Sequence, residues 1–134
     1  TGIKFRLPTD AEWEYAAKGA KENDTHLYSG SDRLNDVAWT ISNANKKTHT
    51  RGEKIPNMLD LYDLTGNVAE WVQDTYNLRK FGNYISNVED NEFYITRGGD
   101  WYNNEESCRN TYKSLVPKGS KGNNIGLRLA CTEM

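Results

Sequence analysis

One segment near the N-terminus carries the clearest helical pattern, and it limits the folds open to this chain. In LPTDAEWEYAAKGA, Thr9 stands three residues before Glu12, which is the spacing of a capping box at a helix start. The apolar residues that follow recur at helical spacings and would share one face: Trp13, Ala16, Ala17 and Ala20. The pattern predicts one core-packing helix that ends near Gly19.

Beyond that helix, turn-forming residues replace long periodic segments. The 134 residues include fifteen asparagines and eleven glycines, which favour turns and irregular chain. Strands are predicted at Ala69–Gln73, after a turn at Gly66 and Asn67, and in FYITRGG. The length suits one domain, residues 1–134, and the mixture predicts an α+β fold with few helices and much irregular loop.

The C-terminal segment IGLRLAC alternates in polarity and predicts one half-buried strand. Its inward-facing residues are expected to be Ile125, Leu127, Leu129 and Cys131. A second short helix is predicted near Pro56–Tyr62, and a loop rich in asparagine and glycine over Asn77–Asn91.

The stretch His26–Asn57 is polar and irregular, which predicts loops that fold only as part of a compact whole. Isolated apolar residues are expected to anchor these loops: Leu34, Val37, Trp39, Ile41 and Ile55.

Charge and hydropathy exclude two classes of partner. The net charge is −2 with no long run of one sign, which argues against a sequence-independent grip on nucleic acid. No segment has eighteen consecutive apolar residues, so no transmembrane segment is predicted. No signal peptide stands at Thr1, and because there is no initiator methionine we expect a fragment or a processed form.

Local catalytic motifs are absent from the sequence. His26 and His49 have no local partner pattern, and no G-x-S-x-G elbow occurs. The histidines and cysteines have no closed zinc spacing, KGSKGNNIG lacks the order of a phosphate-binding loop, and the acidic residues lack EF-hand spacing. Glu70 stands between apolar neighbours and therefore needs a partner, either a metal or backbone donors.

The stretch RGGDWYNNEESCRN, residues 97–110, mixes aromatic and small polar side chains. Tyrosine, tryptophan, serine and asparagine together suit an adaptable binding surface. We assign Trp101 to the core and Tyr102 and Asn103 to a binding role.

Five motifs, in order, resemble the formylglycine-generating enzyme (sulfatase-modifying factor) family: RLPTDAEWEYAAKG, YSGSDRLNDVAW, KKTHTRGEKIPNMLDLYDLTGNVAEW, RGGDW and NNIGLRLAC. The resemblance covers nearly the whole chain. It implies a variant of the C-type lectin fold with small antiparallel sheets, and that the chain is the C-terminal part of such a domain.

The same resemblance implies an activity and a test of it. Enzymes of that family use oxygen and copper, bound by two cysteines, to convert a substrate cysteine to formylglycine, with a motif similar to R-G-G-S-x-x-C-x-x-x-x-C. On this sequence the second cysteine falls on Cys108, and the first falls on Asn103. Because a soft thiolate selects Cu(I), an amide cannot replace it, and the copper pair is incomplete.

Two structural features follow from the resemblance. Cys108, without its copper partner, is expected to form a disulfide with Cys131 in an exported protein. The family's calcium site carries over onto the backbone and acid of the TGNVAEW segment, at Thr65, Gly66, Val68 and Glu70. A second calcium site has only weak counterparts near Asp36 and Val37.

The C-terminal motifs also resemble the variable proteins of diversity-generating retroelements, which bind ligands and are not enzymes. That resemblance implies an extracellular or cell-surface module that binds a protein or other surface ligand. Its binding face is predicted to expose Tyr102, Asn103, Asn104, Ser107, Asn110 and Tyr112 together. The alternative is a formylglycine-generating-type oxidase or related enzyme that modifies a sulfatase cysteine, in which Cys108 would be a free thiol in a deep pocket. The incomplete copper pair favours the binding module.

Overall fold

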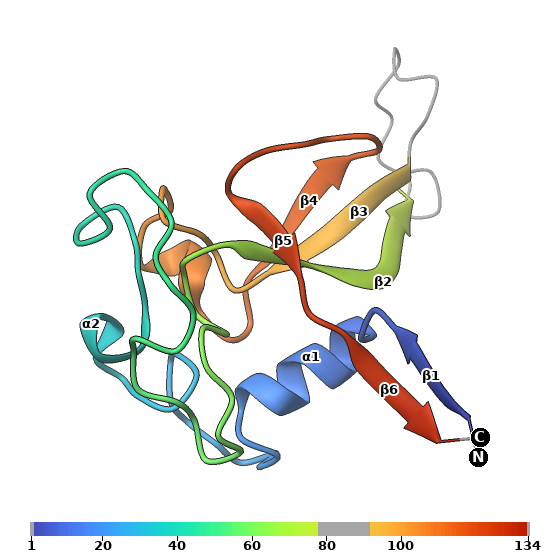
Figure 1. The fold of residues 1–134 in the computed structure, drawn as a ribbon, viewed down its shortest axis with the longest axis horizontal. Helices are drawn as coiled ribbons and strands as arrows, with labels where there is room; N and C mark the ends of the chain where they lie inside the picture. Colours follow the sequence, from blue (N-terminus) through green and yellow to red (C-terminus); the bar gives the residue numbers. More distant parts are fainter. Residues whose placement is uncertain (1, 78–91, 134) are drawn as a thin grey trace.

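The computed structural model describes residues 2–77 and 92–133, and the loop predicted over Asn77–Asn91 lies mainly outside them. Figure 1 shows a mixed α+β fold in which α1 lies beneath a curved sheet and a small ribbon of two strands occupies one corner. The elements in chain order are β1 (Ile3–Arg6), α1 (Asp10–Ala17), α2 (Leu34–Val37), β2 (Ala69–Asn77), β3 (Glu92–Arg97), a 3₁₀ helix (Glu106–Cys108), β4 (Lys113–Pro117), β5 (Ile125–Leu127) and β6 (Ala130–Glu133).

The predicted helix forms with the predicted start. The Thr9 side chain accepts a hydrogen bond from the Glu12 backbone, and the Glu12 carboxylate accepts one from the Thr9 backbone at 2.8 Å. The helix buries Trp13 and Ala17 against Leu64, and Val72 and Ile95 complete this core cluster. A capping box and an apolar stripe therefore place α1 from local sequence alone.

The main sheet has the strand order β4-β3-β2-β5. β2, β3 and β4 are antiparallel neighbours, whereas β5 pairs with β2 in parallel, so the sheet is mixed and not purely antiparallel as expected. β1 and β6 form a separate antiparallel ribbon, in which Phe5 is opposite Cys131.

The predicted C-terminal strand is two strands that belong to different sheets. β5 ends at Leu127 and β6 begins at Ala130, and the break brings Arg128 to the Glu70 carboxylate. Leu127 and Leu129 are 61% and 57% exposed. The prediction of one half-buried strand was wrong because a long-range ion pair turns the chain between the two sheets.

The helix predicted near Pro56–Tyr62 is absent, and a turn takes its place. The Asn57 side chain accepts hydrogen bonds from the Leu59 and Leu61 backbones, and Asp60 has a positive φ of 55°. An asparagine that bonds its own following backbone stabilises a turn in competition with a helix.

Among the loop anchors, Leu34 and Val37 are buried within the short helix α2, and with Tyr28, Ala38 and Cys108 they form a second core cluster. Ile41 and Ile55 are 55% and 58% exposed, so they do not anchor the loops as predicted. No helix in the described residues is long and apolar enough to cross a bilayer.

Candidate functional site

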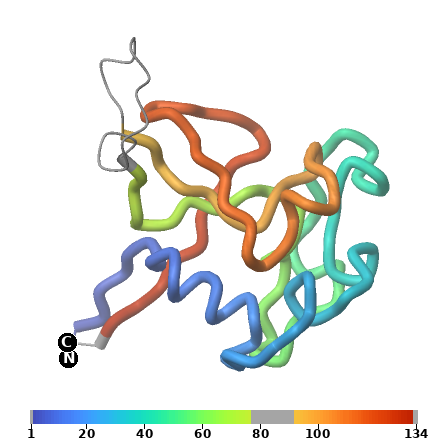
Figure 2. Tube along the Cα trace, turned by 180° about the vertical axis from the view of Figure 1, so that it is seen from behind, coloured from blue at the N-terminus to red at the C-terminus, as the bar shows by residue number. Residues whose placement is uncertain are grey.

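The segment between β3 and β4, residues 98–112, is a long connection between two neighbouring strands of the main sheet, and we call it the tip segment. Its two ends meet because Arg97 is opposite Lys113 in the antiparallel pair of β3 and β4. Seen from both sides, the segment lies against the loops of residues 38–50 (Figures 1 and 2). The ladder therefore fixes where the segment starts and returns.

Two glycines start the tip segment in a conformation that other residues rarely adopt. Gly98 and Gly99 have φ values of 90° and 68°. A Cβ on Gly98 would lie 2.8 Å from the Leu64 carbonyl oxygen, and one on Gly99 would lie 2.5 Å from the Cys108 sulfur. The chain needs glycine at both positions because the backbone passes so close to the core.

Asp100 builds the turn that presents Tyr102. Its buried carboxylate accepts hydrogen bonds from the Tyr102 backbone at 2.8 Å and from the Asn124 amide at 2.9 Å. Its carbonyl oxygen accepts a third, from the Asn103 backbone at 3.0 Å. The result is a rigid turn with Tyr102 63% exposed and its ring edge-on to Trp101.

Asn67 joins the tip segment to the neighbouring loop. Its carbonyl oxygen accepts a hydrogen bond from the Trp101 backbone at 3.0 Å, and its own backbone nitrogen donates to the Trp39 carbonyl at 2.8 Å. Its side chain accepts from the His49 backbone nitrogen at 2.9 Å and donates to the His49 carbonyl at 3.1 Å. One buried residue, through its backbone and its side chain, therefore holds two segments that are far apart in sequence.

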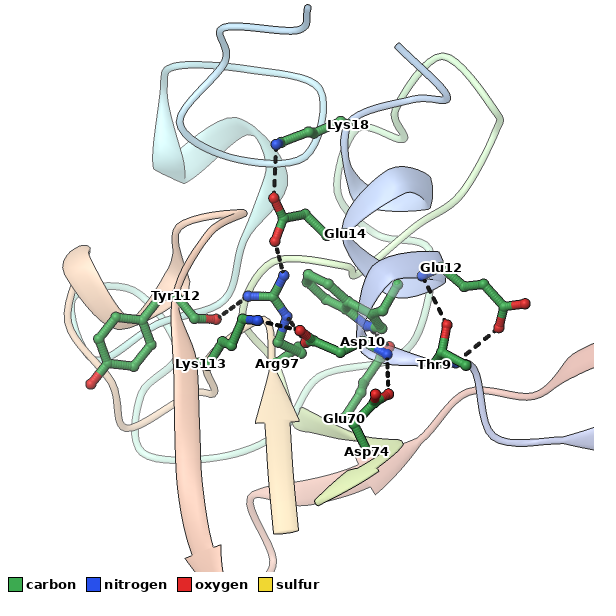
Figure 3. A network of polar contacts seen from close by, with 11 residues as sticks. Thr9, Asp10, Glu12, Glu14, Lys18, Glu70, Asp74, Arg97, Tyr112 and Lys113 are labelled. Carbon is green, nitrogen blue, oxygen red and sulfur yellow. Dashed lines mark hydrogen bonds and ion pairs between the residues drawn. The ribbon is translucent and has the colours of Figure 1, made fainter. Parts of the chain in front are cut away.

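Arg97 holds the far end of the tip segment (Figure 3). Its fully buried guanidinium donates to the Tyr112 carbonyl at 2.6 Å, and it forms ion pairs with Asp10 at 2.9 Å and Glu14 at 2.5 Å. The central carbon of the guanidinium, Cζ, also lies 5.0 Å from the centre of the Trp13 ring. Lys113 pairs with the same Asp10, so the start of β4 is tied to α1 as well.

The sequence analysis missed Asn67, Arg97 and Asp100 as residues that position the site. Arg97 and Asp100 flank the two glycines of the RGGD stretch, and a charged residue on each side of an apolar turn was the available signal. Their long-range partners could not be read from the sequence.

The six predicted binding residues divide into three exposed, two half-buried and one buried. Tyr102 and Asn104 are exposed, Tyr112 is 37% exposed, and Asn103 and Ser107 are half-buried. The expectation for Asn110 was wrong, because it is 2% exposed.

The burial of Asn110 has a structural cause. Its backbone nitrogen donates to the Leu27 carbonyl at 2.9 Å, and its side-chain amide donates to the His26 carbonyl at 3.3 Å. Trp101, which we assigned to the core, is half-buried, and its indole nitrogen lies 3.4 Å from the Asn123 carbonyl oxygen.

Cys108 is a buried residue of the second core cluster. It is 1% exposed, and its sulfur packs where a side chain on Gly99 would stand. Burial raises the pKa of the Cys108 thiol to about 12, and the nearby Asp100 carboxylate acts in the same direction. The protonated thiol is therefore favoured near neutral pH, and this disfavours Cys108 as a nucleophile.

The predicted disulfide is not formed, because both Cys108 and Cys131 are free thiols. Cys131 is exposed on β6, in the ribbon with β1, whereas Cys108 is buried beside the tip segment. The two residues belong to different parts of the fold.

The Glu70 carboxylate has two protein partners, Trp13 and Arg128. It accepts hydrogen bonds from the Trp13 indole at 2.8 Å and from two Arg128 nitrogens at 3.1 and 2.9 Å. The Arg128 guanidinium also donates to the Tyr62 carbonyl at 2.7 Å. These contacts do not fit a calcium bound by the Glu70 carboxylate, because a positive charge already occupies that position.

The other predicted calcium residues lie around the same turn. Thr65 and Gly66 are buried and Val68 is half-buried, and the Thr65 hydroxyl accepts a hydrogen bond from the Ser29 backbone at 3.0 Å. The described residues contain no group of three or more acidic, histidine or cysteine side chains that could hold a metal. A calcium held by backbone carbonyls of Thr65, Gly66 and Val68 stays a prediction of the resemblance.

A surface hollow of about 750 Å³ lies beside the Glu70–Arg128 ion pair and apart from the predicted binding residues. Glu70 and Arg128 line it, together with segments 50–52, 60–63 and 127–129. None of the six predicted binding residues contributes to its walls. The sequence did not predict this hollow, because four segments that are separate in the sequence form it.

Comparison with known proteins decides the family. The sequence model of the "Sulfatase-modifying factor enzyme 1-like domain" family matches residues 2–133, nearly the whole chain. The chain belongs to this family.

Three proteins similar to this chain are named as a variable protein, a chaperone and an inactive enzyme. The solved structure of Treponema denticola variable protein 1 superposes with a TM-score of 0.79 at 34% identity, over 95% of this chain and 47% of that one. The chaperone protein LppX of Paenibacillus barcinonensis is 30% identical over 93% of this chain and 48% of its own length. The inactive C-alpha-formylglycine-generating enzyme 2 of Bos taurus is 27% identical over 93% of this chain and 43% of its length.

These comparisons confirm the expected fold, a small α+β domain of the type found in formylglycine-generating enzymes and C-type lectins. The chain spans less than half the length of each of the three proteins.

Proposed function

We propose that this sulfatase-modifying-factor-like domain is a non-catalytic ligand-binding module whose binding face is the tip segment. The observation that carries the proposal is the contrast within that segment. Tyr102, Asn104 and Tyr112 project into solvent, whereas Cys108, the only residue there that could serve the family's copper chemistry, is buried with a raised pKa.

Chemistry and rigidity support the same proposal. Tyrosine offers a large contact area for little loss of conformational entropy, and asparagine and serine supply adaptable hydrogen bonds. The buried groups of Asn67, Arg97 and Asp100 hold the segment in place before a ligand arrives. A preorganised loop loses less entropy on binding, and this favours affinity.

A surface-displayed variable protein is the form of this function that we favour. The similarity to Treponema denticola variable protein 1 supports it, since that protein shares the fold at 34% identity. Its genetic test is the flanking DNA, where an adjacent reverse transcriptase gene and a near-copy of the sequence encoding the tip segment are expected. Their absence would remove the variable form and leave the binding module.

Selection from a phage-displayed library of random peptides tests the binding face. We expect the wild-type domain to enrich peptides that a Tyr102→Ala/Tyr112→Ala variant fails to bind. Tyr15→Ala is the matched control, because Tyr15 is 51% exposed on α1, outside the tip segment. Equal binding of the enriched peptides to the wild type and the double variant would contradict the proposal.

The alternative function is a formylglycine-generating oxidase, and the free state of Cys108 is the observation in its favour. The domain would be incubated with Cu(I), oxygen and a cysteine-containing peptide, and the peptide analysed by mass spectrometry. We expect no conversion of the peptide cysteine to an aldehyde. Conversion that is lost in Cys108→Ala would establish the oxidase in place of the binding module.

A further inference from the structure

The loop of residues 38–49, which we call the lysine loop, lies directly against the tip segment. The Ile41 backbone nitrogen donates a hydrogen bond to the Asn103 carbonyl at 3.2 Å. Ile41 itself is 55% exposed, close along the surface to the exposed Tyr102 turn. The sequence placed Ile41 in a buried anchor role, so its exposure beside the tip is a feature of the tertiary structure alone.

Hydrogen bonds and a ring stack hold the lysine loop in place, as hydrogen bonds hold the tip segment. The Asn43 side chain accepts a hydrogen bond from the Thr40 backbone at 2.8 Å and donates one to the Ala38 carbonyl at 3.0 Å. The His49 ring stacks on Trp39 with centroids 3.8 Å apart. Together with the Asn67 bridge, these contacts make the loop and the tip one preorganised surface.

The lysine loop carries two adjacent cations. Lys46 and Lys47 are exposed, and in the part of the chain that the structure describes neither has an ion-pair or hydrogen-bond partner for its side chain. Arg33, by contrast, pairs with Asp36 at 3.6 Å. The two free cations stand on a protein whose net charge is −2.

The tip segment does not neutralise these lysines. Its exposed acids, Glu105 and Glu106, form no ion pair with Lys46 or Lys47. Exposed lysines alone are an ordinary solvated surface. Here they belong to the same loop as Ile41, an exposed apolar side chain whose backbone contacts the tip segment, and this combination matches an apolar contact with a charged rim.

We propose that the lysine loop is the second half of the binding face, and that Lys46 and Lys47 select an acidic segment of a protein ligand. The proposal rests on the binding function of the tip segment and names the chemistry of its partner. Tyr102 and Ile41 supply the apolar contacts, and the two lysines sit at the rim. Rim charges chiefly steer association and discriminate among partners, so the lysines set selectivity and salt dependence.

The peptide selection described above tests the proposal. Peptides enriched by the wild-type domain are expected to contain an excess of aspartate and glutamate. An enriched acidic peptide is expected to bind Lys46→Glu/Lys47→Glu roughly tenfold more weakly than wild type, and to bind wild type more weakly as salt rises. The matched control is Lys4→Glu/Lys21→Glu, which makes the same charge change outside both segments and is expected to bind as wild type does.

The variants separate the failure of this inference from that of the proposed function. Circular dichroism melting first checks that each variant is folded. We expect the lysine variants to fold, because the replaced side chains are exposed. If the Tyr102→Ala/Tyr112→Ala variant loses binding but the reversal of Lys46 and Lys47 changes nothing, the acidic-ligand inference is wrong and the tip function stands. A lack of acidic excess among the enriched peptides would overturn it equally. If the tyrosine variant binds as wild type does, the proposed function itself fails.

Discussion

Replacing Arg97 with methionine tests whether the buried ion pairs behind the tip segment stabilise the fold. Methionine keeps much of the side-chain volume and removes the guanidinium, whose side chain has no exposed surface. Asp10 and Glu14 then lose a partner in a largely buried setting, and the Tyr112 carbonyl loses its donor. Breaking a buried pair from one side costs about 3–5 kcal/mol, because a charge is left without compensation.

The lower end of that range applies to Arg97→Met. Asp10 keeps Lys113 and Glu14 keeps Lys18, and the two acidic side chains are 14% and 28% exposed. We expect the free energy of unfolding to fall by about 3 kcal/mol. With an unfolding entropy of about 2.1 cal/mol/K per residue, this lowers the Tm of a domain this size by roughly 10 °C.

Urea unfolding followed by circular dichroism measures the loss, with Arg6→Met as the control. Arg6 pairs with Glu12 at 2.6 Å on the surface, so its replacement should cost less than about 1 kcal/mol. If Arg97→Met costs no more than Arg6→Met, an apolar residue replaces the buried network without loss. Our account of what holds the tip segment would then be wrong.

The same variant changes the acid sensitivity of the fold. Burial raises the pKa of Glu14, but hydrogen bonds from Lys18 and Arg97 outweigh it and leave the pKa below its usual value of 4.5. A carboxyl whose pKa is lowered in the folded state contributes stability above its unfolded pKa and loses it as the pH falls through the folded pKa. The wild type should therefore lose stability below about pH 4.5, and Arg97→Met should lose less over that range.

Three further predictions follow. Ellman's reagent should titrate Cys131 rapidly in the folded protein and Cys108 only after unfolding, because Cys108 is buried with a pKa of about 12; two rapid thiols would contradict its burial. Gly66→Ala should cost about 3 kcal/mol in urea unfolding, because φ is 71° and the added Cβ would lie 2.4 Å from a carbonyl oxygen; an unchanged midpoint would refute this. Arg128→Ala should lower the Tm by roughly 5–10 °C, because Glu70 loses the guanidinium that pairs with it; an unchanged Tm would contradict that role.

Local features were predictable because their causes lie within a few residues. Thr9 and Glu12 define the start of α1 by a reciprocal bond across one helical turn. The turn at Gly66 and Asn67 forms with positive φ at both residues. The exposure of Tyr102 also agreed with the sequence, because a polar stretch beside two glycines forms a surface turn.

The partners of buried polar groups were not predictable. Glu70 needs a partner because it is buried, and the sequence left a metal and backbone donors as the alternatives. The partner is Arg128, 58 residues away, and the same contact splits the predicted C-terminal strand in two. Asn110 resembles its polar neighbours in sequence, yet the approach of the His26 carbonyl buries it.

The sequence by itself determined the family, the helix α1, the glycine turns and the incomplete cysteine pair. Each of these depends on residue identity and short spacing. Only the tertiary structure decided that Cys108 and Cys131 stay apart, that Asn67 joins the tip segment to the lysine loop, and that the Ile41 backbone contacts the tip segment. These outcomes depend on contacts between distant segments, which form only when the whole chain packs around α1 and the sheet.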